Sequence, residues 1–260
     1  MNLRLAATAA AATAAALLGT TAFAEDEQPQ YPEFSVDFGA TVNDGNTEDE
    51  SANVGAEFKH VSDGYEYLLG ANGTITRTTK ETTTIAADGT SKTKKDKETT
   101  AKNGELKGKV LIPVADPFSA YIDASLFSDE IADVDYRAIV GPGIAWNVYK
   151  TDTFVFALEL GVSPMWEKID GEKEYYTMLR AGQRMEKTLE KGAKIFETVE
   201  YLPALNDSDK YLVNGEAGVE SPLSDRLSLR VVFRDKYNSL PGDDNEKNDI
   251  SLNVGVRVKL

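Results

Sequence analysis

The side chains that could support catalysis are few in this sequence. His60 is the only histidine, and it lies two residues before Ser62, which begins a predicted tight turn ending at Gly64. A serine nucleophile needs a neighbouring base, but a lone histidine beside a turn is more often structural, and we interpret His60 in that way. Glu197 and Glu200 are three positions apart, which places them on opposite faces of a strand and argues against a general acid–base pair.

Cofactor and metal patterns are also missing. The chain contains no cysteine, and it has no P-loop, HExxH motif or dinucleotide-binding fingerprint. The acidic stretches 207–209 and 243–246 carry oxygen ligands suited to Ca²⁺ or Mg²⁺, but neither has EF-hand spacing, so we interpret both as solvated loops. The sequence therefore predicts a non-enzymatic protein with no catalytic, cofactor-binding or metal-binding residues. A hydrolase or a surface ligand-binding barrel is the alternative.

Charged residues instead recur at alternate positions along apolar segments. The end of the chain shows the pattern most plainly, because every even position is apolar and every odd position is polar or glycine: Ile250, Leu252, Val254, Val256, Val258 and Leu260 against Ser251, Asn253, Gly255, Arg257 and Lys259. Successive side chains of a strand point to opposite faces of the sheet. Such segments are therefore strands with one apolar and one polar face.

About twelve segments of this kind follow one another between residues 33 and 260. Their connections alternate between short turns, such as 115–117, and mostly longer polar loops, such as 240–249. This asymmetry is typical of outer-membrane barrels, and so are aromatic residues near both strand ends. We therefore predict an all-β fold, a single antiparallel transmembrane β-barrel of about 12 strands. A soluble sandwich would turn the apolar face inward instead.

The N-terminal residues predict the compartment. Arg4 precedes a stretch of small apolar residues that ends in Ala22-Phe23-Ala24, the pattern of a secretory signal peptide. We therefore divide the chain into a cleaved signal peptide (1–24), a short periplasmic segment (25–32) and the barrel (33–260), located in the cell outer membrane of a Gram-negative bacterium. A net charge of −15 argues against general nucleic-acid binding, because phosphates would be repelled.

In such a barrel the apolar face contacts outer-membrane lipid and the polar face lines the lumen. Opposite charges that share a narrow interior can pair across it, so we predict a constricted or closed lumen rather than a wide porin. The predicted lumen charges are Glu57, Lys107, Arg137, Glu159, Arg180, Arg184, Glu216, Arg230, Arg234 and Arg257.

The most distinctive connection is residues 75–105. Its centre, Asp88-Gly89, is a strong hairpin signal, and the threonine-rich arms would let the two strands continue beyond the membrane. We expect a long external hairpin here. Its lysines form a basic island on an acidic protein, and we interpret them first as part of a solvated hairpin. Contact with anionic surface lipid or with the phosphates of surface polysaccharide is the functional alternative. These lysines are Lys80, Lys92, Lys94, Lys95, Lys97 and Lys102.

Several short stretches resemble the bacterial family of salt-induced outer membrane proteins, a domain of unknown function. They are Asp44-Gly45-Asn46-Thr47, Val134-Asp135-Tyr136-Arg137 with Gly141-Pro142-Gly143, Asn206-Asp207-Ser208-Asp209 with Tyr211, and residues 222–230 (PLSDRLSLR). The resemblance implies an outer-membrane β-barrel with no established activity. We expect an envelope component or narrow pore, and its link to envelope or osmotic (salt) stress rests only on the family's name. The resemblance also implies that the barrel assembly machinery recognises the C-terminal strand. Family members usually end in an aromatic residue, whereas Leu260 ends this chain.

Overall fold

The structure is a computed structural model that describes residues 32–43, 48–62, 64–85, 91–242 and 245–260. All of them belong to one compact unit, Tyr31–Leu260. The predicted signal peptide and nearly all of the predicted periplasmic segment lie outside the described residues. No helix among the described residues is long and apolar enough to cross a membrane.

Twelve antiparallel strands form a closed barrel in which each strand pairs with its neighbours in sequence and the last pairs with the first. This confirms the predicted fold class. The strands are β1 (Glu33–Asn43), β2 (Glu48–Val61), β3 (Glu66–Ile85), β4 (Ser91–Ala115), β5 (Phe118–Asp129), β6 (Val134–Lys150), β7 (Phe154–Ile169), β8 (Glu172–Thr188), β9 (Lys194–Pro203), β10 (Tyr211–Pro222), β11 (Leu227–Asn238) and β12 (Asn248–Lys259).

The two-residue alternation sorts side chains between the outside and the inside of this barrel. On β7, Leu158 and Leu160 are exposed on the outer face, whereas Ala157 and Met165 are buried inside. On β12, Ile250 and Leu252 each leave 63% of their surface uncovered by protein. A soluble protein would bury such residues, so this outer surface is of the kind that lipid covers.

β9 is the strand with the weakest alternation in the sequence, because Glu197 falls on the apolar side. The structure nevertheless forms β9 over Lys194–Pro203. Gln183 of β8 donates a hydrogen bond from Nε2 to Glu197 Oε1 at 2.9 Å. The outward carboxylate therefore has a polar partner on the neighbouring strand, which lowers the cost of placing it there.

The connections separate into a short-turn rim and a long-loop rim. Asp116 and Pro117 form the turn between β4 and β5. Leu223 N donates a hydrogen bond to Leu227 O at 2.7 Å, which closes the turn between β10 and β11. Aromatic pairs lie near both rims. Tyr65–Tyr67 and Phe118–Trp146 are near the short turns, and Trp166–Tyr175 and Tyr211–Tyr237 are near the long loops. Two such belts suit two membrane interfaces.

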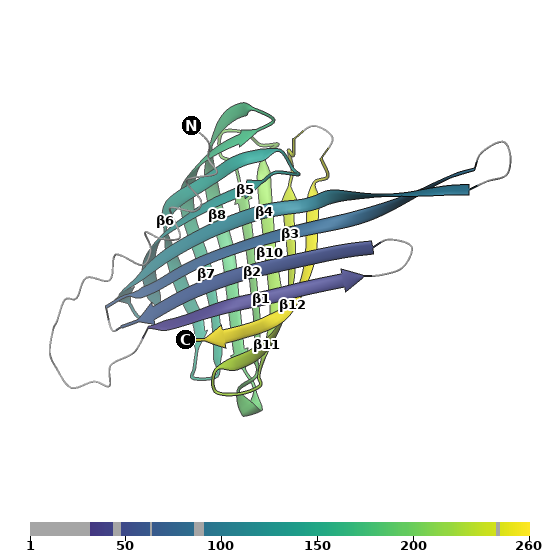
Figure 1. The fold of residues 1–260 in the computed structure, drawn as a ribbon. Coiled ribbons are helices and arrows are strands. Elements are labelled where there is room, and N and C mark those ends of the chain that lie inside the picture. Colours follow the sequence, from purple (N-terminus) through teal and green to yellow (C-terminus); the bar gives the residue numbers. More distant parts are fainter. Residues whose placement is uncertain (1–31, 44–47, 63, 86–90, 243–244) are drawn as a thin grey trace. The chain divides into compact units, whose positions relative to one another are not determined.

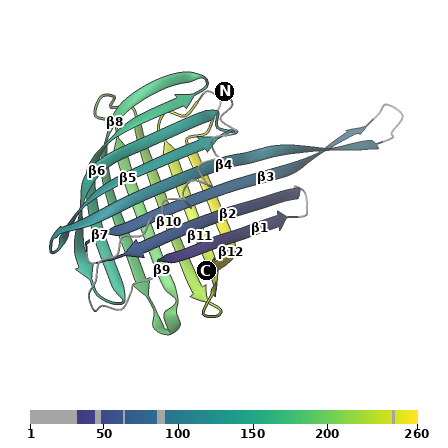
Figure 2. The same cartoon turned by 60° about the vertical axis from the view of Figure 1, so that its left-hand side comes forward.

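β3 and β4 are the longest strands, with 20 and 25 residues. Their ladder continues to the pair Ile85↔Ser91, and Figures 1 and 2 show this hairpin projecting beyond the other strands. The backbone register sets Lys80 opposite Asp96 and Glu81 opposite Lys95. The predicted tip, Asp88-Gly89, lies outside the described residues.

Candidate functional site

The interior of the barrel contains a cavity of about 510 Å³ to which every strand contributes lining residues. All of the predicted lumen charges except Arg257 line it. Arg257 lies beside it and contacts Asp37, which is a lining residue. The structure thus brings these side chains from distant parts of the sequence to one interior, where their ion pairs decide how much open space is left.

One ion pair joins opposite walls of the barrel. Lys236 Nζ on β11 lies 3.1 Å from Glu105 Oε2 on β4, although β3, β2, β1 and β12 separate these strands in the sheet. Glu105 Oε1 also lies 3.3 Å from Lys107 Nζ, and Lys236 Nζ lies 4.2 Å from the centre of the Phe127 ring. Because this cluster crosses the interior, it narrows the space through which a solute could move.

A second cluster crosses the interior on the β4–β9 side. Lys109 of β4 pairs with Glu159 of β7, and Arg180 of β8 pairs with Asp123 of β5 and with Glu200 of β9. Both cations also lie near the Tyr121 ring, with Lys109 Nζ at 4.3 Å and Arg180 Cζ at 5.7 Å from its centre. Both cations thus gain a cation–π contact in addition to their carboxylates.

Glycine makes room for Tyr121. A Cβ on Gly143 of β6 would collide with the Tyr121 ring, and a Cβ on Gly161 of β7 would lie 2.7 Å from its hydroxyl oxygen. The absence of side chains at these two inward positions therefore lets the Tyr121 side chain pack closely against the wall.

A third cluster lies towards the short-turn rim. Arg257 donates to both carboxylate oxygens of Asp37, at 2.8 and 2.9 Å, and to Glu57 Oε2 at 2.7 Å. Arg234 Nε donates to Glu216 Oε2 at 2.6 Å, and Arg230 Nη1 donates to Asp37 Oδ2 at 3.2 Å. Bidentate arginine–carboxylate pairs are strong and fix geometry. Arg184 also lines the cavity, and its Nε has no hydrogen-bond partner among the described residues.

On the β6–β10 side near the long-loop rim, packed side chains fill the interior. Glu167 of β7 receives Arg137 Nε at 2.7 Å and lies 2.5 Å from Lys210 Nζ, which comes from the connection between β9 and β10. The Glu167 and Lys210 side chains are both 0% exposed. Burial lowers the pKa of Lys210, while the Glu167 carboxylate acts in the opposite direction.

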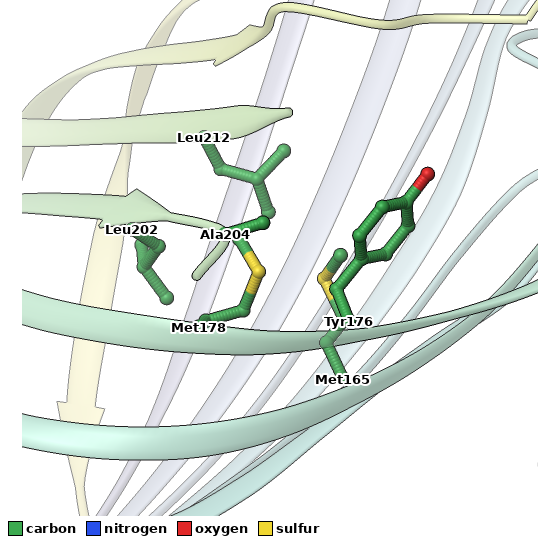
Figure 3. Packing of buried hydrophobic residues seen from close by; sticks show 6 residues of the cluster. All are labelled: Met165, Tyr176, Met178, Leu202, Ala204 and Leu212. Carbon is green, nitrogen blue, oxygen red and sulfur yellow. The ribbon is translucent and has the colours of Figure 1, made fainter. Parts of the chain in front are cut away.

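Apolar side chains pack beneath this buried ion pair. Figure 3 shows Met178 close to Ala204 and Leu212, with Met165 and Tyr176 beside them. Lys210 Nζ also donates to Leu240 O at 3.3 Å, which ties the connection after β9 to the one after β11. Side chains and loops together therefore close this part of the interior.

Sequence reasoning identified Arg137 here but not its partners. Glu167 has the same strand parity as the predicted lumen residue Glu159, so the alternation alone could have identified it. Lys210 lies in a connection, where no periodic signal exists. Lys236 lies at an even position of its strand, as Arg230 and Arg234 do, so the alternation could have identified it as well.

The enzymatic candidates do not form a site among the described residues. The centres of the His60 and Tyr65 rings are 5.9 Å apart, with the ring planes tilted by 46°. His60 Nδ1 has no hydrogen-bond partner in the described part of the chain. A catalytic histidine is normally oriented by a hydrogen bond at that nitrogen. Glu197 lies on the outer face, and Glu200 pairs with Arg180 inside. The described residues contain no cluster of three or more histidine or acidic side chains placed to hold a metal, and Asp243 and Asp244 lie outside them.

Comparison with known proteins identifies the family. Residues 36–260 match the family described as "Protein of unknown function, DUF481". The chain belongs to this family. The match covers nearly the whole barrel of this DUF481 chain. No curated protein is significantly similar to it in sequence.

Solved structures with similar folds are porins and transport barrels. The NanC porin is 8% identical with a TM-score of 0.50, covering 88% of this DUF481 chain and 100% of its own. The KdgM porin in complex with disordered oligogalacturonate is 12% identical with a TM-score of 0.45, covering 87% of this chain and 99% of its own. At such identities the likeness concerns the fold alone. The family match and the closed barrel together support an outer-membrane β-barrel family.

Proposed function

We propose that this protein is a non-enzymatic barrel of the Gram-negative outer membrane whose lumen is a narrow pore, used by the envelope under osmotic (salt) stress. The link to stress rests on the sequence resemblance. Export by a cleaved signal peptide at 1–24 belongs to the same proposal, as does assembly through the C-terminal strand by the barrel assembly machinery.

The observation that carries the proposal is the ion pair between Lys236 and Glu105, which joins opposite walls at 3.1 Å. Charged side chains at a constriction determine which ions can enter and leave a pore. Lys107 adds a cation beside Glu105 with more than half of its side chain accessible to the interior. A solute that crosses the barrel has to pass these groups, which suits small hydrated ions better than bulky molecules.

The hairpin of β3 and β4 supplies the proposed outer contact. Lys94 and Lys97 on its arm are exposed, although Lys94 Nζ lies 2.7 Å from Asp96 and Lys97 Nζ lies 3.0 Å from Glu50. Exposed pairs of this kind are weak and are screened by salt. We propose that these lysines exchange their partners for anionic groups of surface polysaccharide.

Conductance in a planar lipid bilayer tests the pore. The purified wild-type barrel should give small, steady conductance steps. Replacing both partners of the crossing pair (K236A/E105A) should increase the step, because an ion pair that bridges the interior is removed. The matched control is Lys94→Ala, an exposed lysine of the projecting hairpin, which should leave the step unchanged.

Two results would reject the pore. One is wild-type protein that inserts but never conducts, and the other is a K236A/E105A step equal to the wild-type step.

A further inference from the structure

The closure between β1 and β12 extends over only part of the two strands. They form five residue pairs, from Ser35↔Lys259 to Gly39↔Gly255. Along its other edge each strand forms eleven pairs, β1 with β2 and β12 with β11. Beyond Gly39 and Gly255, within the described residues, Ala40–Asn43 and Asn248–Val254 have no partner strand on this side. Figure 1 shows β1 and β12 together near the C-terminus and separating towards the long-loop rim.

Unpaired strand edges are unfavourable inside a bilayer. Backbone N–H and C=O groups in hydrocarbon have no water to bond, so lipid-exposed open sheet edges do not persist there. Such groups are tolerated only where they face a water-filled space or gain a partner. Within the bilayer, the free edges of β1 and β12 must therefore face the aqueous interior or pair with each other. The two arrangements can also alternate.

The sequence of the two edges fits closure with each other. If the register of the five observed pairs continued, Ala40 would face Val254 and Val42 would face Leu252 on the apolar side. Thr41 would then face Asn253, and Asn43 would face Ser251, on the polar side. No shift of register is needed, and a one-residue slip would reverse every face. The same two strands can therefore be parted or fully paired.

The last pair before the parting consists of two glycines. A Cβ on Gly255 would collide with the Phe38 carbonyl, and a Cβ on Gly39 would lie 2.8 Å from Val254 O. Asn53 of β2 lies directly over Gly39, where that Cβ would be. Without side chains the two backbones approach closely at this point, and glycine gives both strands freedom to change direction there.

The parted segment joins two different environments. The interior cavity is lined by residues of both edges, Asp37 and Phe38 of β1 and Asn253 and Gly255 of β12, so it reaches the opening. On the outer face, Phe38, Ile250 and Leu252 are exposed apolar residues. On the inner face lie Asn53 and Asn253, followed by the ion-paired Arg230. Polarity thus changes from apolar to charged across a single strand.

We propose that this parted segment is a lateral opening for a single-chain amphiphile. The acyl tail would remain in the bilayer against Phe38, Ile250 and Leu252, while the polar headgroup enters the interior beside Asn53 and Asn253. The proposal rests on the proposed location in the outer membrane and adds a class of ligand to it. A foreign β-strand fits less well, because the two edges already match each other and a docked strand would seal off the cavity that reaches them.

A disulfide lock combined with a photoreactive lipid tests the opening. The chain has no cysteine, so A40C/V254C introduces the only possible disulfide. Directly opposed cross-strand residues lie within disulfide reach, so oxidation of this variant locks the paired form. The control is V36C/V258C, a pair with the same facing that lies inside the observed ladder. The probe is lysophosphatidylcholine with a diazirine in its headgroup, in liposomes that contain the reconstituted full-length barrel.

The expected result is headgroup labelling at or next to Asn53 and Asn253 in reduced A40C/V254C. Labelling should be lost on oxidation and return on reduction, whereas oxidised V36C/V258C should label as strongly as its reduced form. Failure of A40C/V254C to oxidise would reject the paired form. Labelling that is absent from the reduced protein, or that survives the lock, would reject the lateral opening, and so would a polypeptide cross-linked there instead of lipid.

Conductance of the same preparation keeps the two proposals separate. A barrel that conducts but never labels refutes the lateral opening and leaves the pore, whereas a barrel that labels without conducting refutes the pore and supports the opening.

Discussion

Two regions at the long-loop rim differ in how the barrel wall is held together. On the β6–β10 side, Glu167 and Lys210 are fully buried, apolar side chains pack beneath them, and two connections are joined by the bond from Lys210 to Leu240 O. On the β1–β12 side, Leu252 is 63% exposed and the two strand edges are parted. One side is closed by side chains, which tolerate little change, and the other depends on backbone pairing that can extend or stop.

The largest expected effect comes from breaking the buried ion pair. Glu167→Gln leaves Lys210 and Arg137 without the carboxylate that compensates them, and removing one partner of a buried pair costs about 3–5 kcal/mol. Urea unfolding in detergent micelles should show this loss as a lower midpoint. The control is Asp135→Asn on β6, whose partner Lys168 lies 2.5 Å away but whose own side chain is 53% exposed. It should lose about 0–1 kcal/mol. Equal losses of unfolding free energy in the two variants would show that the buried ion pair stabilises the barrel no more than the exposed one.

Leucine truncation compares the two regions directly. Leu202→Ala removes a side chain that is only 2% exposed in the cluster of Figure 3, and a buried leucine truncated in this way typically costs about 2–5 kcal/mol. Leu252→Ala at the parted edge should cost less, because lipid fills the space that the side chain leaves. Both are measured as unfolding free energies in the same lipid. A larger loss for Leu252→Ala would mean that the parted edge is the more tightly packed region.

Glycine substitution probes the end of the paired segment. Gly255→Ala places a Cβ against the Phe38 carbonyl, and such overpacking costs about 1–3 kcal/mol. Gly70→Ala on β3 is the matched control, because nothing lies within 4 Å of the added Cβ. Urea midpoints should fall for the first variant and stay level or rise for the second. Indistinguishable midpoints would show that β1 and β12 are not in close contact at this pair.

The smallest effect is expected at the projecting hairpin. An epitope inserted between Asp88 and Gly89 should change the unfolding free energy by less than about 0.5 kcal/mol, because exposed loop tips tolerate insertion. Antibody should bind this epitope on unpermeabilised cells, whereas an epitope at Asp116-Pro117 should become reachable only after permeabilisation. The reverse accessibility would invert the proposed topology, and loss of the barrel would place the hairpin in its interior.

The sequence predicted the strands and their faces because alternation is a local property. It predicted Arg230 and Arg234 on the charged face, and the structure shows that Glu216 pairs with both. It could not predict which charges meet across the interior, such as Lys236 and Glu105. An odd or even position specifies the face of the strand, but neither the level along the barrel axis nor the partner. Sequence reasoning also missed the parting of β1 from β12, since alternation in the sequence runs unbroken through Ala40, Val42 and Leu252.

The arginine cluster near the short-turn rim bears on the order in which the barrel folds. Arg257 bonds Asp37 across 220 positions of sequence and Glu57 across 200. Contacts between such distant residues carry the highest loop-closure entropy and form late in folding. Hairpins between neighbouring strands therefore form first, and Arg257 joins the two ends of the completed sheet. Its substitution should chiefly speed unfolding and leave the folding rate almost unchanged, because its contacts are absent until the sheet is complete.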